Sequence, residues 1–414
     1  MSTTKISQLL LSLPFAMSQM GFVSGILAIL IQSTVGCWSS WMMNTLYLQY
    51  RHNTLKDNPH SFKRHTIQMH EVLGGLLGRR WETITLIFSF GIMFSFAAIQ
   101  MVAVGNVVYY INDKLERRTW TLVLGSCFAT TVFIPSLRNY RMWSFAGLVM
   151  IVCTALYMAF ASLAIHQDND VRHTAPHSIR SYFNGFASTI IFGAHAIPVE
   201  LMDAMWQPSK YKLTSLYSDL FMTPVVLFSI ISVYWAFGDN VQYNVFSMLP
   251  RTKFRDAAVV LMLLHQLIQY GICSQPLYII VEKWFKIHQS SSYWKKTLVR
   301  TPVFLGSLLV AIMFPFYGTL SSAAGSIFMT WLYVIPCAAS VLVFWTSKSQ
   351  KNAIEQPPFG TSWLSLHCMN LGAILWMAIM AGGFATWASI SVLRNQAHEF
   401  GLFAKCYRCP RRGS

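Results

Sequence analysis

A histidine and two carboxylates stand close together in an otherwise apolar segment of the chain. The segment Phe186 to Pro208 reads FASTIIFGAHAIPVELMDAMWQP and carries His195, Glu200 and Asp203. An imidazole can gain or lose a proton between a mildly acidic and a neutral solution, because its usual pKa is about 6.5. A carboxyl group that is removed from water can also hold a proton. These residue types indicate proton transfer, and all three are predicted proton-coupling residues.

The same segment contains residues that interrupt a helix. Gly193 and Pro198 flank His195, and a proline removes one backbone hydrogen bond and clashes with the preceding turn. Unwound backbone at membrane depth is tolerated only where protein or a water-filled cavity surrounds it, which is where transporters hold substrates and coupling ions. We therefore expect a broken helix beside a polar site.

Purely structural roles are also open for these residues. His195 could be a buried histidine that is hydrogen-bonded to a neighbouring carbonyl group. Asp203 lies near the predicted cytoplasmic end of its segment, where an ion pair with Lys210 explains it as well as proton transfer does. The residue types alone do not decide between these explanations.

The composition indicates what surrounds this segment. Of the 414 residues, 54% are hydrophobic and only 11% are charged, whereas a soluble domain has about 25% charged residues. Apolar runs recur along nearly the whole chain and are separated by short basic loops. We therefore predict an all-α integral membrane protein, with residues 1–393 forming one transmembrane domain in the lipid bilayer and residues 394–414 forming a C-terminal tail.

A spanning helix needs about 20 apolar residues, and counting such segments gives eleven candidates. Their predicted bounds are Ile6 to Met20, Gly25 to Tyr50, Trp81 to Ile111, Trp120 to Pro135, Met142 to Ile165, Tyr182 to Trp206, Leu216 to Phe237, Ala257 to Trp284, Val303 to Tyr317, Ala323 to Trp345 and Trp363 to Val392.

The basic residues indicate how these segments are oriented. Lys and Arg concentrate in the short loops on the cytoplasmic side of membrane proteins. Most of the loop Lys and Arg residues fall on that side when the N-terminus is placed in the cytoplasm. An odd number of spans then places the C-terminal tail outside the cell. Orientation in the bilayer also explains the net charge of +16 better than a nucleic-acid partner does, because the charge is spread over many loops.

The first predicted span has features in common with the sixth. Ile6 to Met20 is short, contains Pro14, and carries Gln8 and Ser12 near that proline. We expect this helix to be cut short and interrupted. Two interrupted helices at corresponding positions in two halves of a chain are typical of inverted-repeat transporters. Gln8 and Ser12 are therefore candidate substrate-binding residues.

Further polar residues occur inside other predicted spans. Gln100 and Asn106 lie in the third span, and His265 lies in the eighth. They are candidate residues of a substrate-binding cavity. They could instead pair one helix with another, a contact that contributes about 0.6 kcal/mol on average.

No pattern in the chain indicates an enzyme. The sequence has no GxSxG, no HExxH and no glycine-rich phosphate loop after a strand. Cys406 and Cys409 form a single CxxC pair, without the second pair that a structural zinc site needs. We predict a secondary active transporter that uses no metal and no cofactor other than protons as the coupling ion.

Several long runs resemble one family closely. They are TWTLVLGSCFATTVFIPSLRNYRMWSFAGL (119–148), VYWAFGD (233–239), FRDAAVVLMLLHQ (254–266), IMFPFYG (312–318) and FGLFAKCYRC (400–409). These runs resemble plant auxin influx carriers of the amino acid/auxin permease family, and the likeness covers nearly all of the chain.

The resemblance implies a LeuT-like fold of eleven helices and inward symport of indole-3-acetic acid with protons across the plasma membrane. The GGHAV stretch of the family appears here as GAHAI, so His195 is implied to be functionally important and to bind substrate. The first-helix motif of the family appears as QLLLSLPFAMSQMG, from Gln8 to Gly21, which supports Gln8 as a second substrate-binding residue.

The chain also departs from the family pattern. It starts about seven residues before Gln8, whereas family members have a hydrophilic N-terminus there. The family run EIMHAMW reads ELMDAMW here, and Asp203 instead resembles amino acid permeases of the same family. The third helix lacks the polar and Cys-rich residues of the carriers. The alternatives are therefore an amino acid/proton permease of the same fold and a truncated, non-transporting form.

Overall fold

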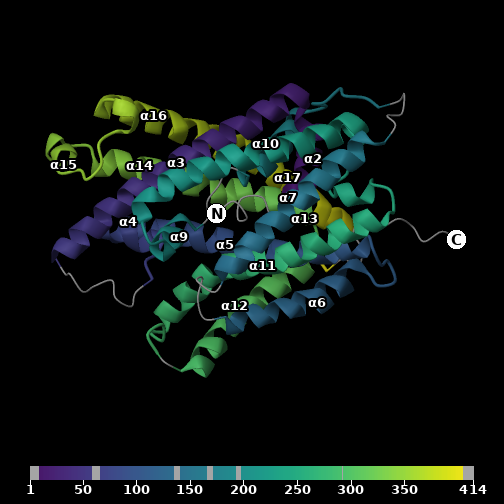
Figure 1. The fold of residues 1–414 in the computed structure, drawn as a ribbon, viewed down its shortest axis with the longest axis horizontal. Coiled ribbons are helices and arrows are strands. Elements are labelled where there is room, and N and C mark those ends of the chain that lie inside the picture. The colour runs from purple at the N-terminus through teal and green to yellow at the C-terminus, as the bar shows by residue number, and fades with distance from the viewer. Residues whose placement is uncertain are drawn as a thin grey trace.

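The computed structural model describes residues 9–57, 66–134, 140–165, 171–192, 197–290 and 292–403. Within these ranges the regular structure is entirely helical (Figure 1). Long helices lie alongside one another. α14 packs between α3 and α16 at one edge of the bundle, and α12 and α6 pack together at the opposite edge.

Eight helical stretches in the described residues are long and apolar enough to cross a membrane. Six are the single helices α3 (Phe22–Asp57), α5 (Arg79–Tyr109), α7 (Arg141–Leu163), α10 (Tyr211–Phe237), α11 (Lys253–Trp284) and α12 (Tyr293–Met313). Each of the other two contains a π-helical segment. One consists of α13 (Tyr317–Ala324), the π-helical residues Gly325–Met329 and α14 (Thr330–Val343). The other consists of α16 (Trp363–Trp376), the π-helical residues Met377–Ala385 and α17 (Thr386–Phe400). The integral membrane class is therefore confirmed.

The other three predicted spans coincide with shorter helices. The first overlaps α2 (Leu9–Met20), the fourth overlaps α6 (Arg117–Cys127) and the 3-10 helix Phe128–Phe133, and the sixth overlaps α8 (Ile179–Ile190) and α9 (Pro198–Ala204). The count of eleven spanning helices stays a prediction. So does the domain boundary at residue 393, beyond which α17 continues to Phe400.

Short helices fill the connections between the long ones. They are α4 (Met69–Leu77), α15 (Ser347–Lys351) and the 3-10 turns Pro208–Lys210, Gly238–Asn240, Val245–Ser247 and Pro358–Gly360. α4 packs against α5 and buries Met69, Val72 and Leu73.

The interruption expected in the sixth span is present. α8 ends at Ile190, and a separate helix, α9, begins at Pro198. Pro198 is the first residue of α9, a position that suits proline because the first helical N–H has no partner inside the helix. His195 itself lies outside the described residues.

The interruption expected at Pro14 is wrong for the described part of the first span. α2 continues through Pro14 from Leu9 to Met20. Proline at this position removes only the hydrogen bond to the Leu10 carbonyl, and the neighbouring turns continue the helix. The chain turns instead at Gly21, whose φ of +90° favours glycine and where a Cβ would lie 2.5 Å from the Ala175 carbonyl oxygen.

One apolar core joins the elements that carry the predicted site residues. Leu10, Leu13 and Met17 of α2 pack in the same buried cluster as Phe192, which follows α8, and Met262 of α11. The first, sixth and eighth predicted spans therefore meet in the interior of the protein.

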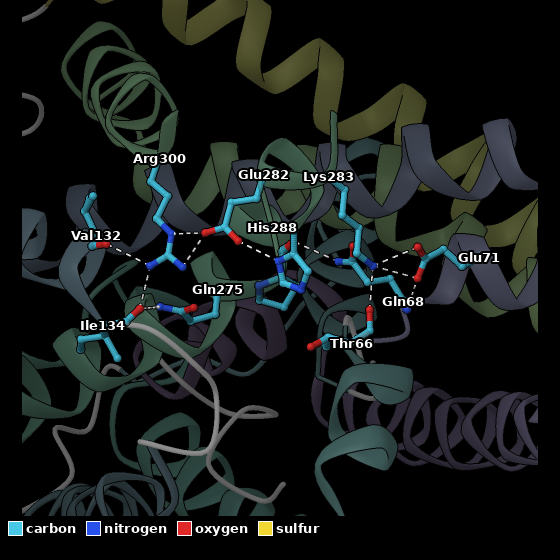
Figure 2. Close-up of polar contacts among 11 residues, drawn as sticks. Thr66, Gln68, Glu71, Val132, Ile134, Gln275, Glu282, Lys283, His288 and Arg300 are labelled. Atoms are coloured by element: carbon cyan, nitrogen blue, oxygen red, sulfur yellow. Dashed lines mark hydrogen bonds and ion pairs between the residues drawn. The ribbon is translucent and has the colours of Figure 1, made fainter. Parts of the chain in front are cut away.

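A buried ion pair fixes the end of α11 (Figure 2). The Nε of Arg300 on α12 lies 2.6 Å from Oε1 of Glu282, and both residues are at least 97% buried. The same guanidinium donates to the carbonyl oxygens of Val132 at 3.0 Å and Ile134 at 2.7 Å. His288 Nδ1 lies 2.8 Å from the other carboxylate oxygen, Oε2. Both oxygens of Glu282 therefore have partners, and the ends of α11, α12 and the 3-10 helix after α6 are tied together.

Arg300→Met is expected to destabilise the protein by about 3 to 5 kcal/mol, because the Glu282 carboxylate then stays buried without its cation. The double variant Glu282→Leu/Arg300→Met should be less destabilised than the single one, because no buried charge is left over. Unfolding of the purified protein in detergent measures both changes. Lys295→Met, an exposed position on the same helix, is the matched control. A double variant that is as unstable as Arg300→Met would contradict this account.

Candidate functional site

The predicted site residues lie on four elements of the described structure. Ser12 is on α2, Gln100 and Asn106 are on α5, Glu200 and Asp203 are on α9, and His265 is on α11. Gln8, His195 and the pair Cys406 and Cys409 lie outside the described residues. In the part of the chain that the structure describes, no group of three or more His, Cys, Asp and Glu side chains could hold a metal ion.

Gln100 and His265 lie between the two ends of an antiparallel helix pair. At one end the Arg255 guanidinium of α11 donates to the Tyr110 carbonyl oxygen, which follows α5, at 3.0 Å. At the other end Phe90 of α5 stacks on Trp284 of α11, with ring centroids 5.7 Å apart. Both site candidates therefore sit in the middle of the pair, and Gln100 is buried there.

His265 links α11 to α7. Its ring is fully buried, and Nδ1 lies 3.0 Å from the Gly147 carbonyl oxygen. An acceptor at that distance favours the neutral tautomer that carries its proton on Nδ1. Nε2 has no hydrogen-bond partner within the described ranges. The contact ties two helices together and leaves one nitrogen available as an acceptor.

Two buried glutamines are further candidates. Gln266, next to His265, and Gln32 of α3 are fully buried, and their amide groups have no hydrogen-bond partner among the residues described. An unsatisfied buried polar group costs about 1 to 3 kcal/mol. Their only signal in the sequence is a polar residue inside an apolar span, which does not distinguish them from residues that pair helices.

Ser12 and Asn106 differ in burial. Ser12 is buried in α2, and its side chain is hydrogen-bonded to that of Tyr317 on α13. Asn106 is only partly buried near the end of α5. The structure therefore engages Ser12 in a contact between helices.

The end of α8 is held by one side chain from α13 and one from α14. The Tyr333 hydroxyl donates to the Ile190 carbonyl oxygen at 2.6 Å, and Ser322 lies 2.9 Å from Ser188. The last carbonyl groups of a helix have no partner inside the helix, so Tyr333 satisfies one of them at the end where the helix is interrupted. Sequence reasoning missed Tyr333, because nothing local distinguishes it from other aromatic residues in an apolar run.

The two carboxylates of α9 contact different elements. Glu200 is 1% exposed, and its Oε1 lies 3.5 Å from Nε2 of Gln68, at the start of α4. Oε2 of Glu200 has no hydrogen-bond partner in the described part of the chain. Asp203 is partly buried and accepts a hydrogen bond from the Tyr47 hydroxyl of α3 at 3.3 Å. Glu200 is therefore the more deeply buried and less satisfied of the two.

A bundle of apolar helices that buries a poorly satisfied carboxylate beside an interrupted helix defines a membrane transporter. Residues 1–382 match the model of the family described as transmembrane amino acid transporter protein. The chain belongs to this family.

Curated relatives extend over nearly the whole chain. The chain is 42% identical to auxin transporter-like protein 3 of Arabidopsis thaliana over 414 residues, covering 99% of this chain and 88% of that protein. It is 43% identical to auxin transporter-like protein 4 of Medicago truncatula, with 99% and 86% covered. Auxin transporter-like protein 1 of Arabidopsis thaliana is 42% identical, with 99% and 85% covered. The resemblance drawn from the sequence is confirmed.

Tyr333→Phe is expected to destabilise the protein by about 1 to 3 kcal/mol, because the buried Ile190 carbonyl group loses its donor. The measurement is the unfolding of the purified protein in detergent. Tyr217→Phe, on α10 where the tyrosine is 65% exposed, removes the same hydroxyl from the surface and should change stability little. Equal stability of Tyr333→Phe and the wild type would show that the end of α8 does not depend on this contact.

Proposed function

We propose that this protein is a proton-coupled symporter that imports indole-3-acetate across the plasma membrane. The observation that carries the proposal is the buried Glu200 carboxyl group, which has one unpartnered oxygen beside the interruption between α8 and α9. The names of the relatives, auxin transporter-like proteins, support the choice of substrate.

The proposed transport cycle depends on the difference in pH between the two sides of the membrane. Outside the cell, where the solution is acidic, His195 or Glu200 takes up a proton while the anionic carboxylate binds nearby. In the neutral cytosol the group loses its proton, and the site then releases the substrate. The membrane potential assists only if more than one proton accompanies each anion, because a single pair carries no net charge.

An indole ring needs an apolar slot with a few convergent polar groups. The proposed slot lies among the first, third, sixth and eighth spans. Gln8, Ser12, Gln100, Asn106, His195 and His265 are its proposed substrate-binding residues, and His195, Glu200 and Asp203 are its proposed proton-coupling residues. The shared apolar core of α2, the end of α8 and α11 supports this assignment.

The proposed architecture has eleven spans in a LeuT-like inverted repeat. It adds α2, α6 with its 3-10 extension, and α8 with α9 to the eight long helical stretches. The basic loops favour a cytoplasmic N-terminus and an extracellular C-terminal tail. The break between α8 and α9 supports one of the two interrupted helices that the repeat requires.

An amino acid/proton permease is the second candidate. Asp203 favours it, because a carboxylate could pair with the ammonium group of an amino acid and auxin has no such group. The description of the family, transmembrane amino acid transporter protein, also favours it. The two candidates share the proton-coupling mechanism and differ in the substrate.

Radiolabelled uptake is expected to separate these candidates. Cells or oocytes that express the protein should accumulate indole-3-acetate faster from an acidic medium than from a neutral one. Unlabelled indole-3-acetate should compete with this uptake, and amino acids should not. If amino acids compete more strongly than auxin, the permease is the correct assignment. If the protein reaches the cell surface but accumulates neither substrate, both candidates are wrong.

A further inference from the structure

Glu200 and Gln68 together present two buried oxygens without donors. Glu200 Oε2 and Gln68 Oε1 both lack a hydrogen-bond partner in the described part of the chain, and the two residues are 1% and 0% exposed. Their side chains touch each other, since Gln68 Nε2 lies 3.5 Å from Glu200 Oε1. A buried acceptor without a donor is unfavourable, most of all on an ionised carboxylate.

Gln68 is held firmly at this position (Figure 2). Its Nε2 also donates to the Pro276 carbonyl oxygen of α11 at 2.9 Å, and its backbone N–H donates to Glu71 Oε2 at 3.0 Å. Glu71 in turn pairs with Lys283 of α11, whose Nζ lies 2.9 Å from each carboxylate oxygen. The amide therefore has a fixed location between α4, α9 and α11.

Among the described residues, Gln68 is the side chain that is hydrogen-bonded to Glu200, and the ionisable groups nearby have other partners. α9 packs against α3 and α4, and the charges of α11 reach the same region. The charged or titratable groups that interact electrostatically with Glu200 include Glu71 of α4, Tyr211 of α10 and Lys283 of α11, and Tyr47 of α3 binds the neighbouring Asp203. Lys283 donates to Glu71 and to the Thr66 carbonyl oxygen, at 2.6 Å, rather than to Glu200.

We propose that Gln68 is a positioning residue that sets the pH at which Glu200 releases its proton. When Glu200 is ionised, the Gln68 amide N–H donates to the carboxylate and stabilises its charge. When Glu200 is protonated, its carboxyl group is neutral and depends less on this donor. The step only makes and breaks an O–H bond, and water carries the proton away. This proposal rests on the proposed proton-coupled function and adds a residue to it.

A small cavity is lined by sequence neighbours of the pair, although Gln68 and Glu200 themselves do not line it. The cavity has a volume of about 10 Å³, and its lining includes Met69, which follows Gln68, and Pro198, which begins α9. The hydroxyl-bearing residues Ser39 and Ser40 of α3 also line it. A buried water needs about 10 to 15 Å³, so the volume of the cavity is close to that of one water molecule.

Gln68→Met tests the proposal, because methionine has nearly the same length but no N–H donor. The ionised form of Glu200 then loses its stabilising contact, so the carboxyl group should keep its proton to higher pH. Infrared titration of the purified protein follows the C=O band of protonated Glu200, which is identified by its loss in Glu200→Gln. Its midpoint should rise by about one pH unit, the size expected for a hydrogen bond to a charged group.

Two further variants make the result specific. Gln68→Glu, which adds a second carboxyl group, should shift the midpoint in the same direction. Gln275→Met is the matched control, because Gln275 is equally buried on α11 and donates to the Ile134 carbonyl oxygen at 2.8 Å. An unchanged midpoint in Gln68→Met, an equal shift in Gln275→Met, or the absence of any Glu200 band would overturn the proposal. The titration needs no transport, so its failure is distinguishable from failure of the proposed function.

Discussion

The cost of burying a charge away from water is the constraint on which this structure depends, because a buried charge needs partners in the protein. Two carboxylates meet this constraint differently. Both oxygens of Glu282 have partners in Arg300 and His288. Glu200 is buried just as deeply, but Gln68 contacts only one of its oxygens. The first arrangement suits a permanent anchor between helices, whereas the second suits a group that exchanges a proton.

The interruption between α8 and α9 makes this second arrangement possible. Because α9 starts afresh at Pro198, Glu200 falls in its first turn and points toward α4 and α11. Tyr333 secures the other side of the interruption at Ile190. A continuous helix would satisfy the Ile190 carbonyl group within its own backbone and would not need the Tyr333 contact. Glu282 lies on α11 and pairs with Arg300 of α12, and the Gln68 amide that contacts Glu200 also donates to the Pro276 carbonyl oxygen of α11.

The sequence was informative where a local rule applies. Length and apolarity predicted the long helices, and Pro198 with Gly193 predicted the interruption in the sixth span. The same rule failed at Pro14, because the loss of one hydrogen bond does not end a helix whose other turns are intact. Gln68 and Tyr333 could not be predicted as site residues. Their importance arises from partners far away in the chain, Glu200 and Pro276 for Gln68 and Ile190 for Tyr333, and such contacts exist only in the folded protein.

Simultaneous measurement of proton and substrate entry tests the central claim most directly. The purified protein is reconstituted in vesicles that contain a pH-sensitive dye, and labelled indole-3-acetate is added outside. Protons are expected to enter the vesicles together with the substrate, in a constant ratio. Without substrate, protons should enter no faster than they enter empty vesicles. Without the protein, neither protons nor substrate should enter faster than the background rate. Substrate uptake by the protein without proton entry would contradict it.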